Sequence, residues 1–347
     1  MLRTLLAHAD DDPQTAALAR DGGDAFVSQS LRPYLVAALL DRDPDRPAIV
    51  VAGDDRAARD LAAGLKTWLE PRPVRHYPSR GVNYESHLAP PPHLVGLRIA
   101  ALDALLDADP GDSSGPAAPV VVVSAVALSE KVPDPAMRPR GFELRTGDLI
   151  DLEECALDLV AAGYERVDQV EDRGQFAIRG GLLDLFPATE DRAVRVDLFG
   201  DEIESLRWFS TFTQRSLGDA EVVEVAPAAE LAAEHRELAE IAALEDASER
   251  PDIAELLPVE NFHSFLELAG EASVLIAGNE DVAPVLADHW QDVTAAFHDE
   301  DAHHLYVAPD EIHQFRNTGS GPLKFLCLIP HPLRSMNAPC AAACGCA

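Results

Sequence analysis

Positive charge is scarce in this chain. Its 347 residues include 28 Lys and Arg against 60 Asp and Glu, so the formal net charge is −32. A surface this acidic repels the phosphate backbone of DNA and RNA. We therefore expect no direct binding of nucleic acid and predict that the partner is a protein.

Long apolar runs are missing as well. No run approaches the roughly 20 apolar residues that a membrane-spanning helix needs. Asp10, Asp11 and Asp12 stand where a secretion signal would need its apolar core. We expect a cytoplasmic protein without membrane contact. The first 24 residues are acidic and rich in alanine, which predicts a flexible lead-in or one frayed helix.

Cysteine is rare and unevenly placed. Cys155 and Cys327 are isolated, while Cys340, Cys344 and Cys346 crowd the end of the chain. This spacing is not the disulfide framework of a small secreted protein. A thiolate metal clip at the end would need a second cluster upstream, and the sequence has none. We predict no cofactor.

A glycine-rich phosphate loop is absent where a nucleotide-binding protein would carry one. A short strand is expected at 25–29 and a helix after it, but the connection at 28–33 is Ser-Gln-Ser-Leu-Arg-Pro. A phosphate loop needs glycines, whose backbone N–H groups wrap the phosphates, and a lysine. The expected strand at Val120 also lacks an acidic pair for Mg²⁺. These absences argue against an ATPase or a helicase, and we predict that the chain is not an enzyme.

Outside the stretch 163–209, the sequence has an α/β pattern. Apolar runs at 48–53 and 119–125 are typical of buried strands, and the segments 54–70 and 93–108 between them predict helices. One more apolar strand is expected at 273–278. Apolar strands that alternate with helices predict a parallel sheet covered on both sides.

The stretch 163–209 predicts a β-meander of antiparallel strands. Its alternation and turn residues place strands at 166–171, 175–186, 194–199 and up to Phe209. The Gly180-Gly181 pair interrupts the longest strand, which indicates a bulge or the close approach of another backbone, and a change of buried face. Two apolar sets are expected to line the sheet: Phe176, Ile178 and Leu182, and then Val194, Val196 and Leu198.

Three arginines of the meander, Arg166, Arg173 and Arg179, are the functional candidates, with Phe176 beside them. Arginine and aromatic side chains dominate the energetics of protein interfaces, because a guanidinium pairs bidentately with a carboxylate and a ring buries much area. The competing interpretation is that these are ordinary surface arginines that balance neighbouring acids. Residue types alone favour that interpretation, because exposed arginine is common.

The meander resembles a known family. RGQFAIRGGLLDLFPA at 173–188, followed by RVDLFGDEIESL at 195–206, is similar to the small β-rich domain of UvrB. It is more similar still to the counterpart of that domain in the amino-terminal module of the bacterial transcription-repair coupling factor (Mfd). The resemblance extends, more loosely, over about 25–308.

The resemblance implies the architecture. We expect an α/β fold in which a degenerate, helicase-like (RecA-like) parallel-sheet domain carries an inserted β-rich meander domain. The predicted domains are a flexible lead-in at 1–24, the first half of the α/β domain at 25–130, the β-rich domain at 131–228, the returning half at 229–308, and a poorly anchored tail at 309–347.

The resemblance also implies a function. In the family, the β-rich domain binds UvrA, which makes this chain a non-catalytic interaction module of transcription-coupled nucleotide excision repair. Arg166 and Arg179 stand at matching motif positions, so the resemblance reverses the preference for ordinary surface arginines. We assign the UvrA contact to Arg166, Arg173, Phe176, Arg179 and Phe186, although each phenylalanine is more typical of a core. RNA polymerase and DNA are expected to be reached only through domains that this chain lacks.

The tail suggests an alternative. APDEIHQFRNTGSGPLKFLCLIPHP, from Ala308, resembles the second conserved motif of a cupin, in which His313 would be a metal ligand. A metal-dependent cupin enzyme is therefore the alternative function. A metal site needs three or four converging ligands, and the sequence has no earlier motif to supply them. The adjacent His303 and His304 would point to opposite faces of a strand. We predict no metal site and keep His313 only as a weak candidate.

Overall fold

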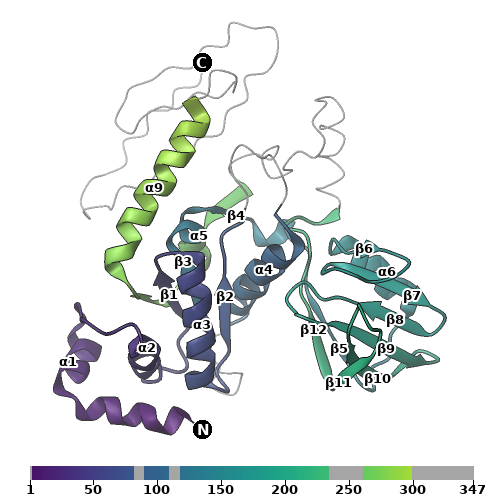
Figure 1. Ribbon diagram of the computed structural model, residues 1–347, viewed down its shortest axis with the longest axis horizontal. Coiled ribbons are helices and arrows are strands. Elements are labelled where there is room, and N and C mark those ends of the chain that lie inside the picture. The colour runs from purple at the N-terminus through teal and green to yellow at the C-terminus, as the bar shows by residue number, and fades with distance from the viewer. Residues whose placement is uncertain (1, 82–89, 109–117, 234–260, 299–347) are drawn as a thin grey trace, which may run out of the picture. The chain divides into compact units, whose positions relative to one another are not determined.

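The computed structural model describes residues 2–81, 90–108, 118–233 and 261–298 (Figure 1). The chain divides into a unit of Met1–Gln291 and a second unit of Asp292–Ala347. Of the second unit, only residues 292–298, the end of one helix, are described. The first unit contains a parallel sheet in an α/β part and a larger sheet in a β-rich part.

Four parallel strands form the centre of the α/β part. They are β1 Ala48–Ala52, β2 Val74–Tyr77, β3 Val120–Ser124 and β14 Ser273–Ile276. Their order is β14-β1-β3-β2, so β1 lies between a strand from the first half of the chain and one from near its end. Ala48 lies opposite both Val120 and Ser273. β1 and β3 are buried throughout, as continuous apolar strands predict.

Helices cover both faces of this sheet. They are η1 Leu2–Asp11, α2 Arg32–Leu40, α3 Asp55–Leu69, α4 Pro92–Leu106, α5 Ala125–Ser129, α8 Phe265–Leu268 and α9 Asn279–His298. Helix α1, Pro13–Asp21, packs on η1 and α2. Val50 and Val122 face a core made with η1, α2 and α3. Ile49 and Val121 face the opposite core, made with α4, α5 and α8. The predicted α/β class is thereby confirmed.

The first residues of the chain are more ordered than expected. We predicted a flexible lead-in or one frayed helix, and in the structure η1 and α1 form, because Leu6 and Ala9 are buried in the core of α2 and α3. An ion pair of 2.7 Å between Arg3 Nε and Asp41 Oδ1 adds to this contact. The strand expected at 25–29 is not there, and the side chain of Phe26 is fully exposed. Strand β2 was not predicted, because its sequence Val-Arg-His-Tyr has no apolar run.

A six-stranded sheet forms the β-rich part, in the order β11-β10-β9-β8-β7-β6 (Figure 1). Its strands are β6 Glu165–Arg166, β7 Gln175–Arg179, β8 Leu182–Leu185, β9 Ala193–Phe199, β10 Glu202–Phe209 and β11 Ser216–Ala220. One face packs against helix α6, Leu152–Ala161, and a two-stranded sheet of β5, Phe142–Arg145, with β12, Val222–Val225. Val194 and Val196 belong to this core, and Leu198 packs against it, as predicted.

Two connections tie this part to the α/β part. Strand β4, Lys131–Pro133, follows α5 and pairs with β13, Phe262–Ser264, which precedes α8. The short 3-10 helix η2, Pro135–Met137, then leads towards β5. The β-rich sheet is therefore inserted between strands that belong to the α/β part. The exact domain boundaries stay predictions.

The first strand of the meander is shorter than expected and runs the other way. We predicted an antiparallel strand at 166–171, but β6 has two residues and pairs parallel to β7. The chain turns away after it, because the side-chain Oε1 of Gln175 accepts hydrogen bonds from the backbone N–H groups of Glu171 and Asp172, both at 3.0 Å. A side chain that satisfies the backbone locally competes with a sheet ladder.

Gly180 and Gly181 form the loop of a two-residue hairpin, so the predicted bulge inside one long strand is wrong. Arg179 on β7 lies opposite Leu182 on β8. Gly180 has a φ of 63°, which glycine adopts without strain and which such loops require. The predicted close approach is present, because a Cβ on Gly181 would lie 3.2 Å from the carbonyl oxygen of Leu198.

The hairpin decides which residues are buried. Phe176 lies opposite Leu185, and Ile178 opposite Leu183, and all four contribute to one core. Leu182 lies on the other face, so its predicted place beside Phe176 is wrong. The change of face at the glycines, which the sequence predicted, is what moves the buried positions on β8.

Some predictions concern residues outside the described part of the chain. They include the tail at 309–347 and its candidate ligand His313. Within the described ranges, no helix combines the length and apolarity that crossing a membrane would require.

Cys155 on α6 provides a test of the β-rich core. Burial raises the pKa of its thiol to about 11, so only about one molecule in a thousand would carry a thiolate at pH 8. We expect Cys155 to resist iodoacetamide in the native protein at pH 8 and to react once urea unfolds it, as followed by peptide mass spectrometry. Rapid labelling of Cys155 in the native state would contradict the packing of α6 on the sheet.

Candidate protein-binding surface

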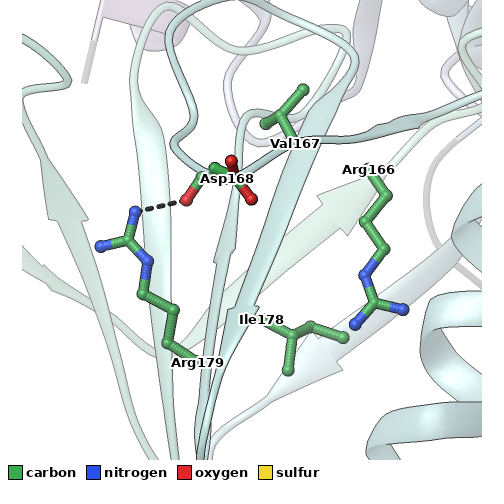
Figure 2. A pocket seen from close by; sticks show the side chains of 5 residues that line it. All are labelled: Arg166, Val167, Asp168, Ile178 and Arg179. Carbon is green, nitrogen blue, oxygen red and sulfur yellow. Dashed lines mark hydrogen bonds between the residues drawn. The ribbon is translucent and has the colours of Figure 1, made fainter.

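A hollow of about 760 Å³ opens at the end of the β-rich sheet where β6 and β7 pair. It is lined by Arg166, Val167 and Asp168 from β6 and the residues after it, and by Ile178 and Arg179 from β7. Figure 2 shows the side chain of Ile178 between those of the two arginines. The lining thus combines two guanidinium groups with an apolar floor and a single carboxylate.

The hairpin holds Arg179 at the rim. Its side chain is exposed, and Nη2 donates a hydrogen bond to the backbone carbonyl of Asp168 (Figure 2). This bond ties the segment after β6 to the end of β7 and leaves the remaining N–H groups of the guanidinium available. The neighbouring Gly180 reverses the chain directly after Arg179, which places the arginine at the edge of the sheet.

Arg166 lies across the hollow on the short strand β6. The parallel pairing of β6 with β7 puts Arg166 beside Phe176, and its side chain is exposed. Within the described residues, no hydrogen bond or ion pair engages its guanidinium. In a chain with 60 acidic residues against 28 basic ones, an arginine without an internal carboxylate is available to a carboxylate on a partner.

Arg173 and Phe186 form a separate contact and do not line the hollow. The Nε of Arg173 donates to the carbonyl of Glu190 at 2.6 Å, and its Nη2 pairs with the carboxylate of Asp191. The guanidinium lies 5.7 Å from the ring centroid of Phe186, which is half-buried. Burial, together with the charge of Arg173, lowers the pKa of His93 on α4. Internal partners therefore hold this arginine.

Phe176 is a core residue. Its side chain is 0% exposed and packs in the cluster between the sheet and α6. A partner cannot reach it in this fold, so its place in the predicted contact set is corrected. The sequence signal was ambiguous because a phenylalanine flanked by arginines fits both a core strand and an interface.

Three lining residues were missed as site residues: Val167, Asp168 and Ile178. Ile178 was expected only as an apolar position of a strand. Val167 and Asp168 were expected on a continuous strand, where their side chains would alternate between faces. Only the early end of β6 brings them to the hollow, and the residues themselves carry no signal of that turn.

The outer face of the same sheet is charged but internally balanced. Arg195 pairs bidentately with Asp184, with distances of 2.6 and 2.7 Å, and the carboxylate raises the pKa of Arg195. Arg207 pairs with Asp197, which also accepts from Ser205. These arginines already have carboxylate partners, which distinguishes them from Arg166.

The described residues contain no cluster of metal-ligating side chains. Among the residues that the structure describes, no three His, Cys, Asp or Glu side chains are arranged to hold a metal ion.

Comparison with known proteins shows what the β-rich part is similar to. Residues 142–231 match the family model of the UvrB interaction domain. The chain is 37% identical over 189 residues to the transcription-repair-coupling factor of Mycobacterium bovis. This match covers 54% of this chain and 15% of that protein. The chain is 29% identical over 208 residues to the coupling factor of Bacillus subtilis, covering 60% of this chain and 17% of that protein.

The similarity also reaches UvrB itself. Over 231 residues the chain is 27% identical to UvrABC system protein B of Mannheimia succiniciproducens, covering 60% of this chain and 33% of that protein. Residues 142–231 are therefore similar to a UvrB interaction domain, in a stretch that resembles part of the coupling factors, and the match spans less than a fifth of the length of the two coupling factors. Nothing in the comparisons supports the cupin alternative for the tail.

The core position of Phe176 leads to a stability prediction. Phe176→Ala should lower the free energy of unfolding by about 3–5 kcal/mol, because it empties a fully buried site. Urea unfolding followed by circular dichroism measures this change. The matched control is Phe199→Ala, on the same sheet but 80% exposed, which should change stability by no more than about 0.5 kcal/mol. Equal losses from the two variants would contradict the placement of Phe176.

Proposed function

We propose that this module binds UvrA through the arginine-lined hollow and so recruits the nucleotide excision repair machinery. The observation that carries the proposal is the pair of exposed arginines, Arg166 and Arg179, on the edge of a UvrB interaction domain. The apolar floor at Ile178 gives an entering side chain a surface to bury. We therefore expect the contacting residue of UvrA to be a carboxylate with an aliphatic stem.

Charge explains why the site would be selective. The chain repels acidic surfaces in general because its net charge is −32. A local pair of guanidinium groups can overcome this only at short range, where hydrogen bonds to a carboxylate form. The partner must therefore fit the hollow closely, which favours one specific protein over non-specific association.

The α/β part supports a non-catalytic role. At the carboxyl end of β1, where nucleotide-binding α/β proteins hold phosphates, a Cβ on Gly53 would lie 2.8 Å from Cβ of Asp281. The next residue, Asp54, caps α3 with its carboxylate. Two carboxylates at this position repel phosphate, and the connection at 28–33 that leads into α2 has neither glycine nor lysine to bind it.

The proposal also covers the cellular process and the contacts with RNA polymerase and DNA. The process that we assign to the module is transcription-coupled repair, in keeping with the names of its relatives, and we expect it to act in the cytoplasm. We assign contacts with RNA polymerase and DNA to other domains, because the acidic surface of this chain does not favour phosphate.

The proposal is tested by titration calorimetry of this chain against UvrA from the same source. Wild type should bind saturably, and the Arg166→Ala, Arg179→Ala double variant should lose affinity by roughly 30-fold or more, as two interface arginines typically contribute. A matched control removes the same charge elsewhere: Arg56→Ala, Arg59→Ala on α3, whose side chains are 84% and 66% exposed. This control should bind like wild type.

The outcomes separate two questions. Absence of binding by the wild-type chain would overturn UvrA recruitment as the function. Binding that both double variants retain would leave UvrA as the partner but move its site away from the hollow. Equal weakening by the two double variants would indicate long-range charge rather than a contact.

A further inference from the structure

A buried cluster of four charged side chains lies where the β-rich part returns to the α/β part. Arg80 follows β2, Arg98 lies on α4, and Glu130 follows α5. Glu230 follows β12 and is within the matched UvrB interaction domain. The side chains are only 20%, 3%, 12% and 12% exposed, in that order, which is unusual for charged residues.

The contacts cross between the two parts. Nη1 of Arg98 donates to Glu130 at 2.6 Å and to the carbonyl of Pro78 at 2.8 Å. Its Nε lies 3.7 Å from the carboxylate of Glu230, and Nη2 of Arg80 lies 2.9 Å from the same carboxylate. The backbone N–H of Arg80 also donates to Glu130, at 3.1 Å to each oxygen. Both arginines thus contact both glutamates.

The cluster joins segments from both parts. Arg98 and Glu130 belong to the α/β part, whereas Glu230 lies in the segment that matches the UvrB interaction domain. If the β-rich part moved away, Arg98 would stay buried on α4 with one carboxylate fewer. Leaving a buried charge without its partner is strongly unfavourable. The cluster therefore penalises other orientations more than it stabilises the fold, since a buried ion pair contributes little stability of its own.

Close backbone packing surrounds the cluster. A Cβ on Gly96 of α4 would lie 2.6 Å from Cβ of Ala188, and one on Gly174 would lie 2.9 Å from Cβ of Pro92. Both contacts join α4 to the β-rich part, and larger residues would hold the two apart. Because the four side chains are largely buried, solvent weakens the attraction between their charges less than it would at the surface.

We propose that the cluster of Arg80, Arg98, Glu130 and Glu230 is a latch that fixes the orientation of the β-rich part on the α/β part. The arginine-lined hollow then keeps a set direction relative to α4 and the parallel sheet. A motion of the α/β part would be passed directly to the docking surface. This inference does not depend on which protein the hollow binds.

The latch is tested by distances between two spin labels in the whole chain. Cysteines are introduced at Thr67 on α3 and at Glu204 on β10, both exposed, in a background whose five native cysteines are replaced by serine. Pulsed electron resonance should give one narrow distance distribution for the otherwise wild-type protein. The Glu230→Gln variant should roughly double its width, because parts of a chain move relative to each other unless their contact is strong.

A second ion pair across the same junction provides the matched control. Nη2 of Arg75 on β2 pairs with Glu224 on β12 at 2.8 Å, but the side chains are 36% and 39% exposed. Glu224→Gln removes the same charge and should leave the distribution narrow, because an exposed pair contributes little. An unchanged width in Glu230→Gln, or equal broadening in both variants, would overturn the latch.

Two further measurements keep the result interpretable. If Glu230→Gln does not fold by circular dichroism, Arg80→Gln takes its place, since it removes the most exposed member and keeps the pair of Arg98 and Glu130. The same two outcomes then decide. Titration with UvrA is run in parallel, and Glu230→Gln should bind within about twofold of wild type, because the docking arginines are untouched. Failure of the latch and failure of UvrA binding therefore give different results.

Discussion

The parallel pairing of β1 with both β3 and β14 is the constraint on which the rest of the structure depends. Ala48 lies opposite Val120 on one side and Ser273 on the other. The chain leaves the α/β part after β3 and returns to it before β14, which pairs with β1. The β-rich sheet therefore begins and ends at the same junction. The buried charges at Arg98 and Glu230 lie at that junction, which explains why they can join its two sides.

Most of the prominent arginines in this acidic chain have internal carboxylates. Arg195 and Arg207 balance aspartates on the outer face of the β-rich sheet, and Arg98 is buried among glutamates. In such pairs the N–H groups of the guanidinium already donate to a carboxylate of the same chain. The arginines at the hollow are different, since Arg179 donates only to a backbone carbonyl and Arg166 has no partner among the described residues. The candidate surface thus combines two exposed guanidinium groups that line one hollow.

The sequence predicted elements well where one physical signal dominated. Continuous apolar runs marked β1 and β3. It failed where two local forces compete. At 166–171 a strand pattern competes with the side chain of Gln175, which satisfies the backbone and ends the strand. At Gly180 a bulge and a hairpin can use the same residue type, because one type of bulge and the tight hairpin loop both place glycine at a positive φ.

The sequence by itself determined the α/β class, the β-rich part and the acidic composition, and it named the candidate arginines, because composition, periodicity and motif order are local properties of the chain. Only the tertiary structure decided how each arginine is used. Arg173 is held by Glu190 and Asp191, Phe176 is buried, and Arg166 is left exposed. Those outcomes depend on strand register and on contacts between distant segments. Register is set by packing a whole face at once, so no single residue type can report it.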